Sequence, residues 1–141
     1  MTVTLSDDAR QYIAAFEEET GATAKDCVVD DEFDRLLILV KAGQMGQAIG
    51  PGGQAVGRVE EQVGREVKLV EDAPTAEDFV ASALSPAAVY NVTISENDDT
   101  VAYAEVADED RGVAIGADGR NIAAARTLAK RHFDVDDVEL T

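Results

Sequence analysis

Two short glycine-rich segments carry the clearest chemical signal in the sequence. Residues 46–53 read GQAIGPGG and residues 112–119 read GVAIGADG, so both fit G-x-A-I-G-x-x-G, with Gly50 matching Gly116 at an offset of 66. A G-x-x-G turn between two helices presents backbone N–H groups and the positive end of a helix dipole with no side chain in the way. That arrangement suits an anion, and a phosphodiester backbone in particular. A single copy is a weak signal, whereas two matching copies indicate an internal duplication.

The segments around the two turns predict the same order of elements. The first half predicts a helix over 6–20, strands over 24–30 and 33–41, a short helix over 42–49, a helix ending near residue 63 and a strand over 66–70. The second half predicts a helix over 75–84, strands over 88–95 and 100–106, a short helix over 108–115, a helix over 120–132 and a strand over 135–140. Ser6 suits an N-cap and Gly21 suits a helix stop. Each half therefore reads α-β-β-α-α-β, which is an α+β fold class.

The duplicated pattern resembles two consecutive KH domains, whose G-x-x-G loop clamps the backbone of about four nucleotides. The order of elements matches the type II arrangement, since only one short strand fits between the helix at 120–132 and Thr141. A freestanding pair of this length resembles the archaeal NusA-like transcription factors. The resemblance implies two tandem type II KH domains, residues 1–72 and 73–141, each with a three-stranded mixed sheet. It also implies single-stranded RNA binding during transcription elongation, termination or antitermination, with RNA polymerase as a second candidate partner.

The expected RNA contacts are the two loops and the polar residues beside them. They are Lys41, Gln47, Gly50, Pro51, Gly52, Gly53, Gln54 and Arg58 in the first copy, and Gly116, Ala117, Asp118, Gly119, Arg120 and Asn121 in the second. The family pattern has a basic residue in the variable pair of the loop. Neither Pro51-Gly52 nor Ala117-Asp118 contains one, and Asp118 places an acid where phosphate is expected.

The net charge argues at first against nucleic acid as a partner. The 141 residues contain 29 Asp and Glu against 12 Lys and Arg, which gives a formal charge of -17 and a pI near 4.1. However, residues 35–59 and 119–133 contain none of the 29 acids and seven of the 12 bases. Both segments adjoin a G-x-x-G loop, so we interpret them as a face kept free of acid. The bases on it are Arg35, Lys41, Arg58, Arg120, Arg126, Lys130 and Arg131, with an ordinary solvated face as the alternative for Lys130 and Arg131.

The acidity itself has two interpretations. It is either a polyanionic surface for basic proteins or the solvated surface of a protein that works in molar salt. Acids are spread along the chain and only four of the 12 bases are Lys, which favours the high-salt interpretation. No signal peptide or membrane span is visible, so we expect a cytoplasmic protein without a membrane partner. We also expect a monomer. The aromatic residues are expected in the core, as is the single cysteine, Cys27.

Two other functions compete with RNA binding as interpretations of the sequence. Residues 50–55 also fit the dinucleotide pattern G-x-G-x-x-G/A, but Val40 ends its strand ten positions before Gly50, whereas that site requires the strand to lead directly into the glycines. No nucleophile–base pair or zinc spacing occurs, so no enzyme activity, cofactor or metal is expected. The stronger rival is an adaptor that docks on RNA polymerase or another protein through its acidic surface, with little affinity for RNA.

Overall fold

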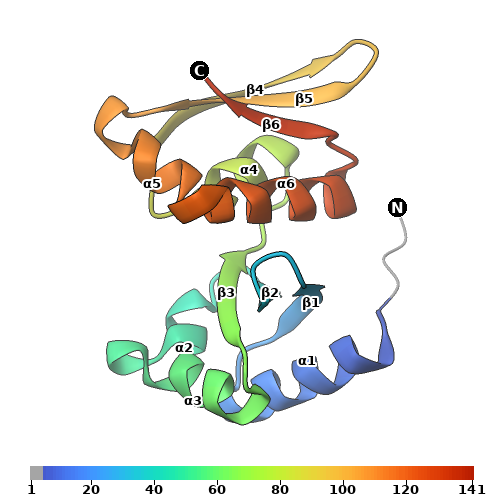
Figure 1. Cartoon of the computed structure of the whole chain (residues 1–141), viewed down its shortest axis with the longest axis vertical. Coiled ribbons are helices and arrows are strands. Elements are labelled where there is room, and N and C mark those ends of the chain that lie inside the picture. Colours follow the sequence, from blue (N-terminus) through green and yellow to red (C-terminus); the bar gives the residue numbers. More distant parts are fainter. Residues whose placement is uncertain (1–4) are drawn as a thin grey trace. The chain divides into compact units, whose positions relative to one another are not determined.

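The computed structural model describes residues 5–141, which form two compact units, one ending at Asp72 and the other beginning at Ala73 (Figure 1). The first unit contains α1 (Asp7–Thr20), β1 (Ala24–Asp30), β2 (Arg35–Val40), α2 (Met45–Ile49), α3 (Gln54–Val63) and β3 (Glu66–Glu71). The second contains α4 (Ala76–Ala83), β4 (Val89–Glu96), β5 (Thr100–Val106), α5 (Arg111–Ile115), α6 (Arg120–Phe133) and β6 (Asp137–Leu140). Both units therefore have the predicted order α-β-β-α-α-β.

Each unit has one three-stranded sheet with the same topology. The strand orders are β1-β2-β3 and β4-β5-β6, so β2 and β5 are the central strands. The first two strands of each sheet pair antiparallel and the last two pair parallel, with registers such as Val28↔Leu37 and Ala102↔Val138. The predicted α+β class with two mixed sheets is confirmed.

Helices cover one face of each sheet and supply its core. In the first unit Phe16 of α1 and Val59 of α3 pack with Leu36 and Ile38 of β2, and all four are fully buried. Burying a side chain of this size contributes about 1.5–3 kcal/mol, so this cluster is a major part of the unit's stability. In the second unit, alanines on α6 are buried beside large apolar side chains of α4, α6 and β6, among them Phe79, Leu128 and Val138.

The predicted caps of α1 are confirmed, and a similar cap fixes the start of α4. The Ser6 hydroxyl accepts a hydrogen bond from the Ala9 N–H at 3.1 Å, and Gly21 ends α1 with a φ of 72°. In the second unit the Thr75 hydroxyl accepts from the Asp78 N–H at 3.2 Å, so α4 begins one residue later than predicted.

Several predicted boundaries are wrong by a few residues. The strand expected from residue 33 begins at Arg35, because residues 31–34 form a turn in which Asp34 has a φ of 49°. The helix expected from residue 42 begins at Met45, and the one expected over 108–115 is a 3-10 turn followed by α5. The last strand begins at Asp137 rather than residue 135, after Asp134 ends α6 in a left-handed conformation.

The expectation that every aromatic residue belongs to the core is wrong for two tyrosines. Phe16 and Phe79 are fully buried, but Tyr90 on β4 is 68% exposed and Tyr103 on β5 is 36% exposed. Cys27 is buried, as predicted. Within residues 5–141, no helix is long and apolar enough to cross a membrane.

Candidate nucleic-acid interface

The first glycine of each loop has the same backbone conformation and the same steric requirement. Gly50 has φ 75° and ψ 168°, and Gly116 has φ 79° and ψ 169°, a region that only glycine occupies readily. A Cβ on Gly50 would lie 2.8 Å from both the backbone N and the Cβ of Ala55. A Cβ on Gly116 would meet the same two atoms of Asn121 at the same distance. The start of the following helix therefore packs directly on this glycine in both units.

The last two loop positions also match between the copies. Gly52 has φ 61° and ψ 21°, and its counterpart Asp118 has φ 57° and ψ 22°. Gly53 and Gly119 follow with φ values of 78° and 79°. Left-handed residues other than glycine are most often Asn or Asp. The acid that departs from the family pattern is thus one of the few side chains that this backbone position tolerates.

Both loops lead into a helix whose first turn contains no acid. The N–H of Gly53 donates to the Gly50 carbonyl at 3.1 Å, and that of Gly119 donates to Gly116 at 3.0 Å, which closes each turn. Within residues 5–141, and apart from the residues next to it in the chain, no atom lies within 4 Å of where a Cβ on Gly53 or Gly119 would be. A ligand can therefore approach the backbone closely at these two glycines, beside the positive end of the α3 or α6 dipole.

The short helix before each loop is anchored by equivalent hydrogen bonds. The Gln44 side chain accepts from the Thr23 N–H at 2.6 Å, and the Asp110 side chain accepts from the Ala88 N–H at 2.7 Å. Gln44 and Asp110 are separated by the same offset as the loops. This role was not predicted from the sequence. The available signal was that both copies have a polar residue six positions before the first glycine of the loop.

Exposed apolar side chains beside the loops were also missed. Ile49 is 40% exposed and Ile115 is 41% exposed, although the alanine before each of them is fully buried. Val113, two residues before Ile115 on α5, is 46% exposed. Each loop is therefore bordered by an apolar surface, which suits the flat faces of nucleobases. The sequence signal for this surface was the Ala-Ile pair that precedes the first glycine in both repeats.

The predicted contact residues of the two copies lie in different units, and most of them are accessible. Exposed side chains or backbone occur at Lys41, Gln47, Pro51, Gly52, Gln54, Arg58, Ala117 and Asp118. The remaining glycines of the loops, Gly50, Gly53, Gly116 and Gly119, are half-buried, as is Arg120. Asn121 alone among the predicted contacts is buried.

The prediction for Asn121 is wrong. Its side-chain amide donates to the carbonyls of Leu84 at 3.2 Å and of Ala114 at 3.1 Å. These bonds join the start of α6 to α5 and to the end of α4, so the amide is not available to a base or a phosphate. Its counterpart in the first copy is the buried Ala55.

Basic residues in the acid-free segments can still contact acids from other parts of the chain. Arg35 is almost fully buried and its Nε lies 2.8 Å from an Asp30 carboxylate oxygen, with the guanidinium 5.0 Å from the centre of the Phe33 ring. Burial, and secondarily the Arg35 charge, lowers the pKa of Lys68 on the neighbouring strand. Arg35 is therefore a structural residue of the sheet.

Two bases on α6 are paired with acids that follow the helix. The Arg126 Nε lies 2.9 Å from an Asp137 carboxylate oxygen and donates to the Val138 carbonyl. The Lys130 ammonium lies 2.6 Å from Asp136 and 3.1 Å from Asp134. Its hydrogen bond to Asp136 raises the pKa of Lys130, and the same bond lowers the pKa of Asp136. Exposed pairs of this kind contribute little to stability, so a phosphate can compete with the carboxylates for these bases.

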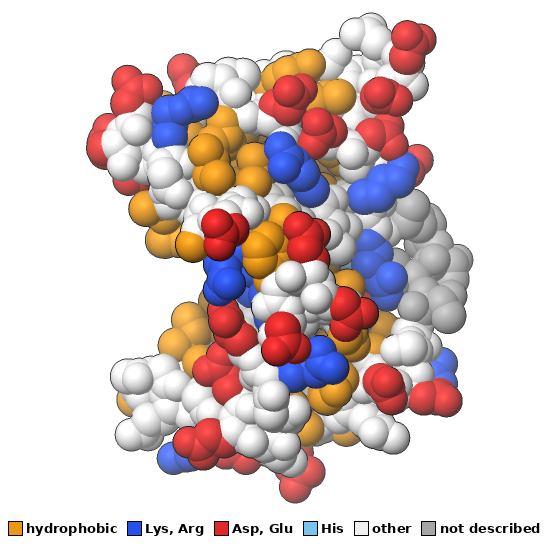
Figure 2. Space-filling model, viewed as in Figure 1, with side chains coloured by type: hydrophobic (Ala, Val, Ile, Leu, Met, Phe, Trp, Pro, Cys, Tyr) orange, Lys and Arg blue, Asp and Glu red, His pale blue; other side chains and the backbone are white. Residues whose placement is uncertain are grey.

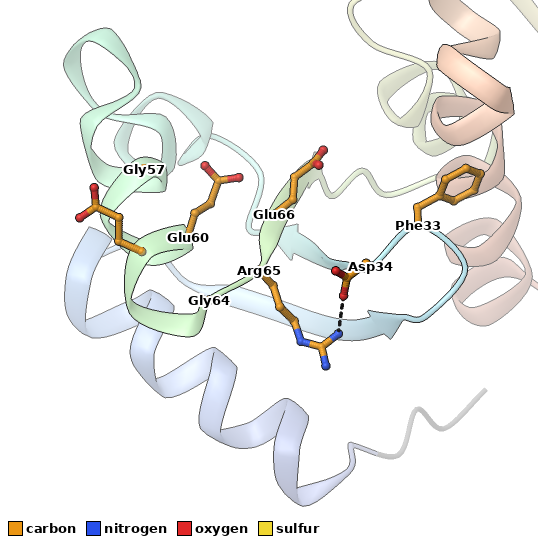
Figure 3. Close-up of a pocket in the computed structure, with 8 residues that line it drawn as sticks. Phe33, Asp34, Gly57, Glu60, Gly64, Arg65 and Glu66 are labelled. Carbon is orange, nitrogen blue, oxygen red and sulfur yellow. Dashed lines mark ion pairs between the residues drawn. The ribbon is translucent and has the colours of Figure 1, made fainter.

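A pocket of about 650 Å³ lies beside α3 in the first unit (Figure 3). Its lining includes Glu60 and Glu61 of α3, Glu66 of β3, and Asp34, which pairs with Arg65 at 3.6 Å. Four acids and one base make this pocket unfavourable for phosphate. The repeat alignment places Arg126 and Thr127 of the second unit at the positions of Glu60 and Glu61.

Carboxylates are scattered over the face shown in Figure 2 and do not form one block. This agrees with the spread of acids along the sequence. No group of three or more His, Cys, Asp or Glu side chains within residues 5–141 is placed to hold a metal ion.

Comparison with known proteins decides the family. Residues 10–98 match the KH domain family, and residues 76–141 match the NusA-like second KH domain family. The chain is 68% identical over its full length to the whole of a protein from Halobacterium salinarum called "Probable transcription termination protein NusA". It is 61% identical over 99% of both chains to a protein of the same name from Halococcus morrhuae. This chain belongs to the NusA-like family of KH-domain proteins.

The fold of this NusA-like chain is also that of a solved structure. The crystal structure of APE1850 superposes with a TM-score of 0.87 at 30% identity, over 97% of this chain and all of that one. The close NusA-like relatives come from halophilic archaea, which supports the high-salt interpretation of the charge.

Proposed function

We propose that this chain is a single-stranded RNA-binding transcription factor that acts in elongation, termination or antitermination. The observation that carries the proposal is the repeated loop: two G-x-x-G turns share backbone dihedral angles and each leads into a helix without acid in its first turn. The relatives named as transcription termination proteins, which match over the full chain, support the process. The units ending at Asp72 and beginning at Ala73 support one KH domain over residues 1–72 and another over 73–141.

In this proposal the RNA backbone passes over the last glycine of each loop. Gly53 and Gly119 leave room for a sugar-phosphate, and the dipoles of α3 and α6 favour its charge. Ile49 and Ile115 supply apolar surface against which bases pack. The polar contacts are Lys41, Gln47, Gln54 and Arg58 in the first copy and Arg120 in the second.

The two copies are expected to contribute differently. The first loop is uncharged, and no carboxylate within residues 5–141 pairs with Lys41, but Arg58 lies 3.8 Å from a Glu19 carboxylate oxygen and the pocket along α3 is acidic. The second loop carries Asp118, but α6 presents Arg126 and Lys130. We expect the first unit to hold RNA mainly at its loop and the second to extend contacts along its helix.

The role we propose is binding and not catalysis, in agreement with a family of transcription factors. We further propose RNA polymerase as a protein partner, a cytoplasmic location and a monomeric state. A protein-binding adaptor with little affinity for RNA is the second candidate, and the acidic pocket formed around Glu60, Glu61 and Glu66 favours it.

Adding acids to both loops tests the proposal. The triple variant Pro51→Asp, Gly52→Asp, Ala117→Asp should bind a fluorescent single-stranded RNA of about a dozen nucleotides at least about 10-fold more weakly, because KH loops hold the backbone directly. The fold should survive, since Asp118 already occupies in the second loop the conformation that Gly52 has in the first. Binding is measured by fluorescence anisotropy at the lowest KCl concentration at which circular dichroism shows the parent and both variants folded, because molar salt would screen the added charges.

The matched control is Gln11→Glu, Ala14→Glu, Asn97→Asp. It adds the same three charges at exposed positions on α1 and in the turn after β4. The control should bind RNA as the parent does. Equal affinity of parent and loop variant would refute the loop assignment, and no measurable binding by the parent would favour the adaptor.

A further inference from the structure

A second pocket lies in the second unit, between the start of α4 and β4. Its volume is about 220 Å³, and it is lined by Glu77, Asp78 and Ala81 of α4 and by residues 89–92 of β4. The lining contains two carboxylates and no Lys or Arg. It contains no residue of either G-x-x-G loop and none of the predicted RNA contacts, so the proposed RNA function leaves it without a role.

The aromatic residue that lines this pocket is Tyr90. It is 68% exposed, the largest fraction among the exposed large apolar side chains of the described residues. The pairing of β4 with β5 passes from Val89↔Val106 to Asn91↔Glu105, so Tyr90 lies in a bulge and has no cross-strand partner. A tyrosine ring in this position presents a face to a cation, and two carboxylates line the same pocket.

β4 is also an edge strand, because the order of its sheet is β4-β5-β6. Edge strands are normally protected from further pairing by charged residues or proline. The equivalent edge strand β1 carries the exposed Lys25 and the half-buried Asp30. In contrast, the only charged residue of β4 is Glu96 at its last position, and residues 79–95 contain none. The β4 edge is therefore left open to pairing where the matching edge is not.

We infer that this groove binds an extended, arginine-containing segment of a protein partner, which adds a strand to the edge of β4. One arginine of the segment enters the pocket, stacks on Tyr90 and pairs with Glu77 and Asp78. Main-chain hydrogen bonds along residues 91–95 provide the affinity and the pocket provides the specificity, as in other cases of strand addition. Arginine is favoured over lysine because its planar guanidinium stacks on a ring and pairs with carboxylate at the same time.

The probe for this site is a synthetic peptide in which arginine alternates with threonine and valine. Titrated into the isotope-labelled full chain in high salt, it should shift the amide signals of Glu77, Asp78 and residues 90–95 and leave those of both loops unchanged. A peptide with glutamate in place of arginine tests the charge. A peptide with N-methylated backbone tests the strand pairing. Both should bind at least about 10-fold more weakly, since each removes one of the two recognition elements.

Variants of the chain separate this site from a general attraction of basic peptides to an acidic protein. Tyr90→Ala should lower the affinity for the arginine peptide about 5-fold, which is the effect expected from losing a partly desolvated cation–π contact. Glu77→Gln should weaken it by a similar factor. Tyr103→Ala is the matched control, because Tyr103 is an exposed tyrosine on the central strand of the same sheet. It should leave the affinity unchanged.

The inference fails if Tyr90→Ala and Tyr103→Ala bind the peptide equally, or if the glutamate peptide binds as well as the arginine peptide. It also fails if single-stranded RNA shifts the same amides, since the groove would then belong to the RNA site. These outcomes do not depend on whether the loops bind RNA, so the two proposals are tested separately.

Discussion

Replacing the first or the last glycine of one loop by alanine should have clearly different effects on stability. Gly50 has the φ and ψ of a region that only glycine occupies readily, and a Cβ there would lie 2.8 Å from the backbone N of Ala55. Strain of about 1–3 kcal/mol adds to the cost of moving the start of α3, so Gly50→Ala should lower the free energy of unfolding by about 3–5 kcal/mol. Gly53 has a left-handed φ of 78° and no atom within 4 Å of an added Cβ. Gly53→Ala should therefore cost only about 1–2 kcal/mol.

RNA affinity should separate the same two variants in a different way. The methyl group of Gly53→Ala projects where the proposed sugar-phosphate approaches, so this variant should remain folded and bind RNA several-fold more weakly. Unfolding is followed by circular dichroism in urea at high salt, and binding by anisotropy below the transition. In the second loop, Gly116→Ala and Gly119→Ala provide an internal repeat of the experiment, since both geometries recur there. Equal destabilisation by the two substitutions would refute the packing argument, and unchanged affinity of Gly53→Ala would refute the close approach of RNA.

Two further predictions concern side chains whose roles emerged from the structure. Asn121→Ala removes two buried hydrogen bonds, those to the Leu84 and Ala114 carbonyls, and should lower the free energy of unfolding by about 2 kcal/mol. The exposed Gln54→Ala should change it by less than about 0.5 kcal/mol in the same urea titration. Asp136 has a pKa lowered by its bond from Lys130, so its contribution to stability is present above the ordinary carboxyl pKa and is lost as the pH falls through the lowered value. Asp136→Asn should therefore be less stable than the parent at neutral pH, and in urea titrations the difference should shrink as the pH falls below the ordinary carboxyl pKa and through the lowered pKa of Asp136.

The order of elements could be predicted because each is specified locally. A serine cap and a stopping glycine delimit α1, the apolar run of β2 indicates a central strand, and the repeated glycines define the loops. The errors fall where local patterns are ambiguous. Asp34 and Asp134 adopt left-handed conformations that end a turn and a helix, and neither is distinguishable in sequence from an ordinary exposed acid.

The sequence predicted where the two loops of the candidate site lie, but it predicted less well which side chains around them are exposed or paired. Charge along the sequence suggested a basic face, yet Arg35, Arg126 and Lys130 are each held by an acid from outside the acid-free segments. Such pairings depend on which strand or turn the fold brings beside a helix. The buried amide of Asn121 and the exposed ring of Tyr90 have the same cause, because burial of a single side chain is a tertiary property.

The acid in the second loop is best understood by comparing two energies. A carboxylate about 7 Å from a phosphate is repelled by about 0.6 kcal/mol in water, and molar salt reduces this roughly 10-fold. Holding an ordinary side chain at the left-handed φ of Asp118 costs about 1–2 kcal/mol. In high salt the conformational requirement therefore outweighs the charge. The same screening weakens every attraction between a base and a phosphate, so affinity for RNA must depend on contacts that salt does not screen. In the proposed complex these contacts are the close backbone approach at Gly53 and Gly119 and the apolar surface of Ile49 and Ile115.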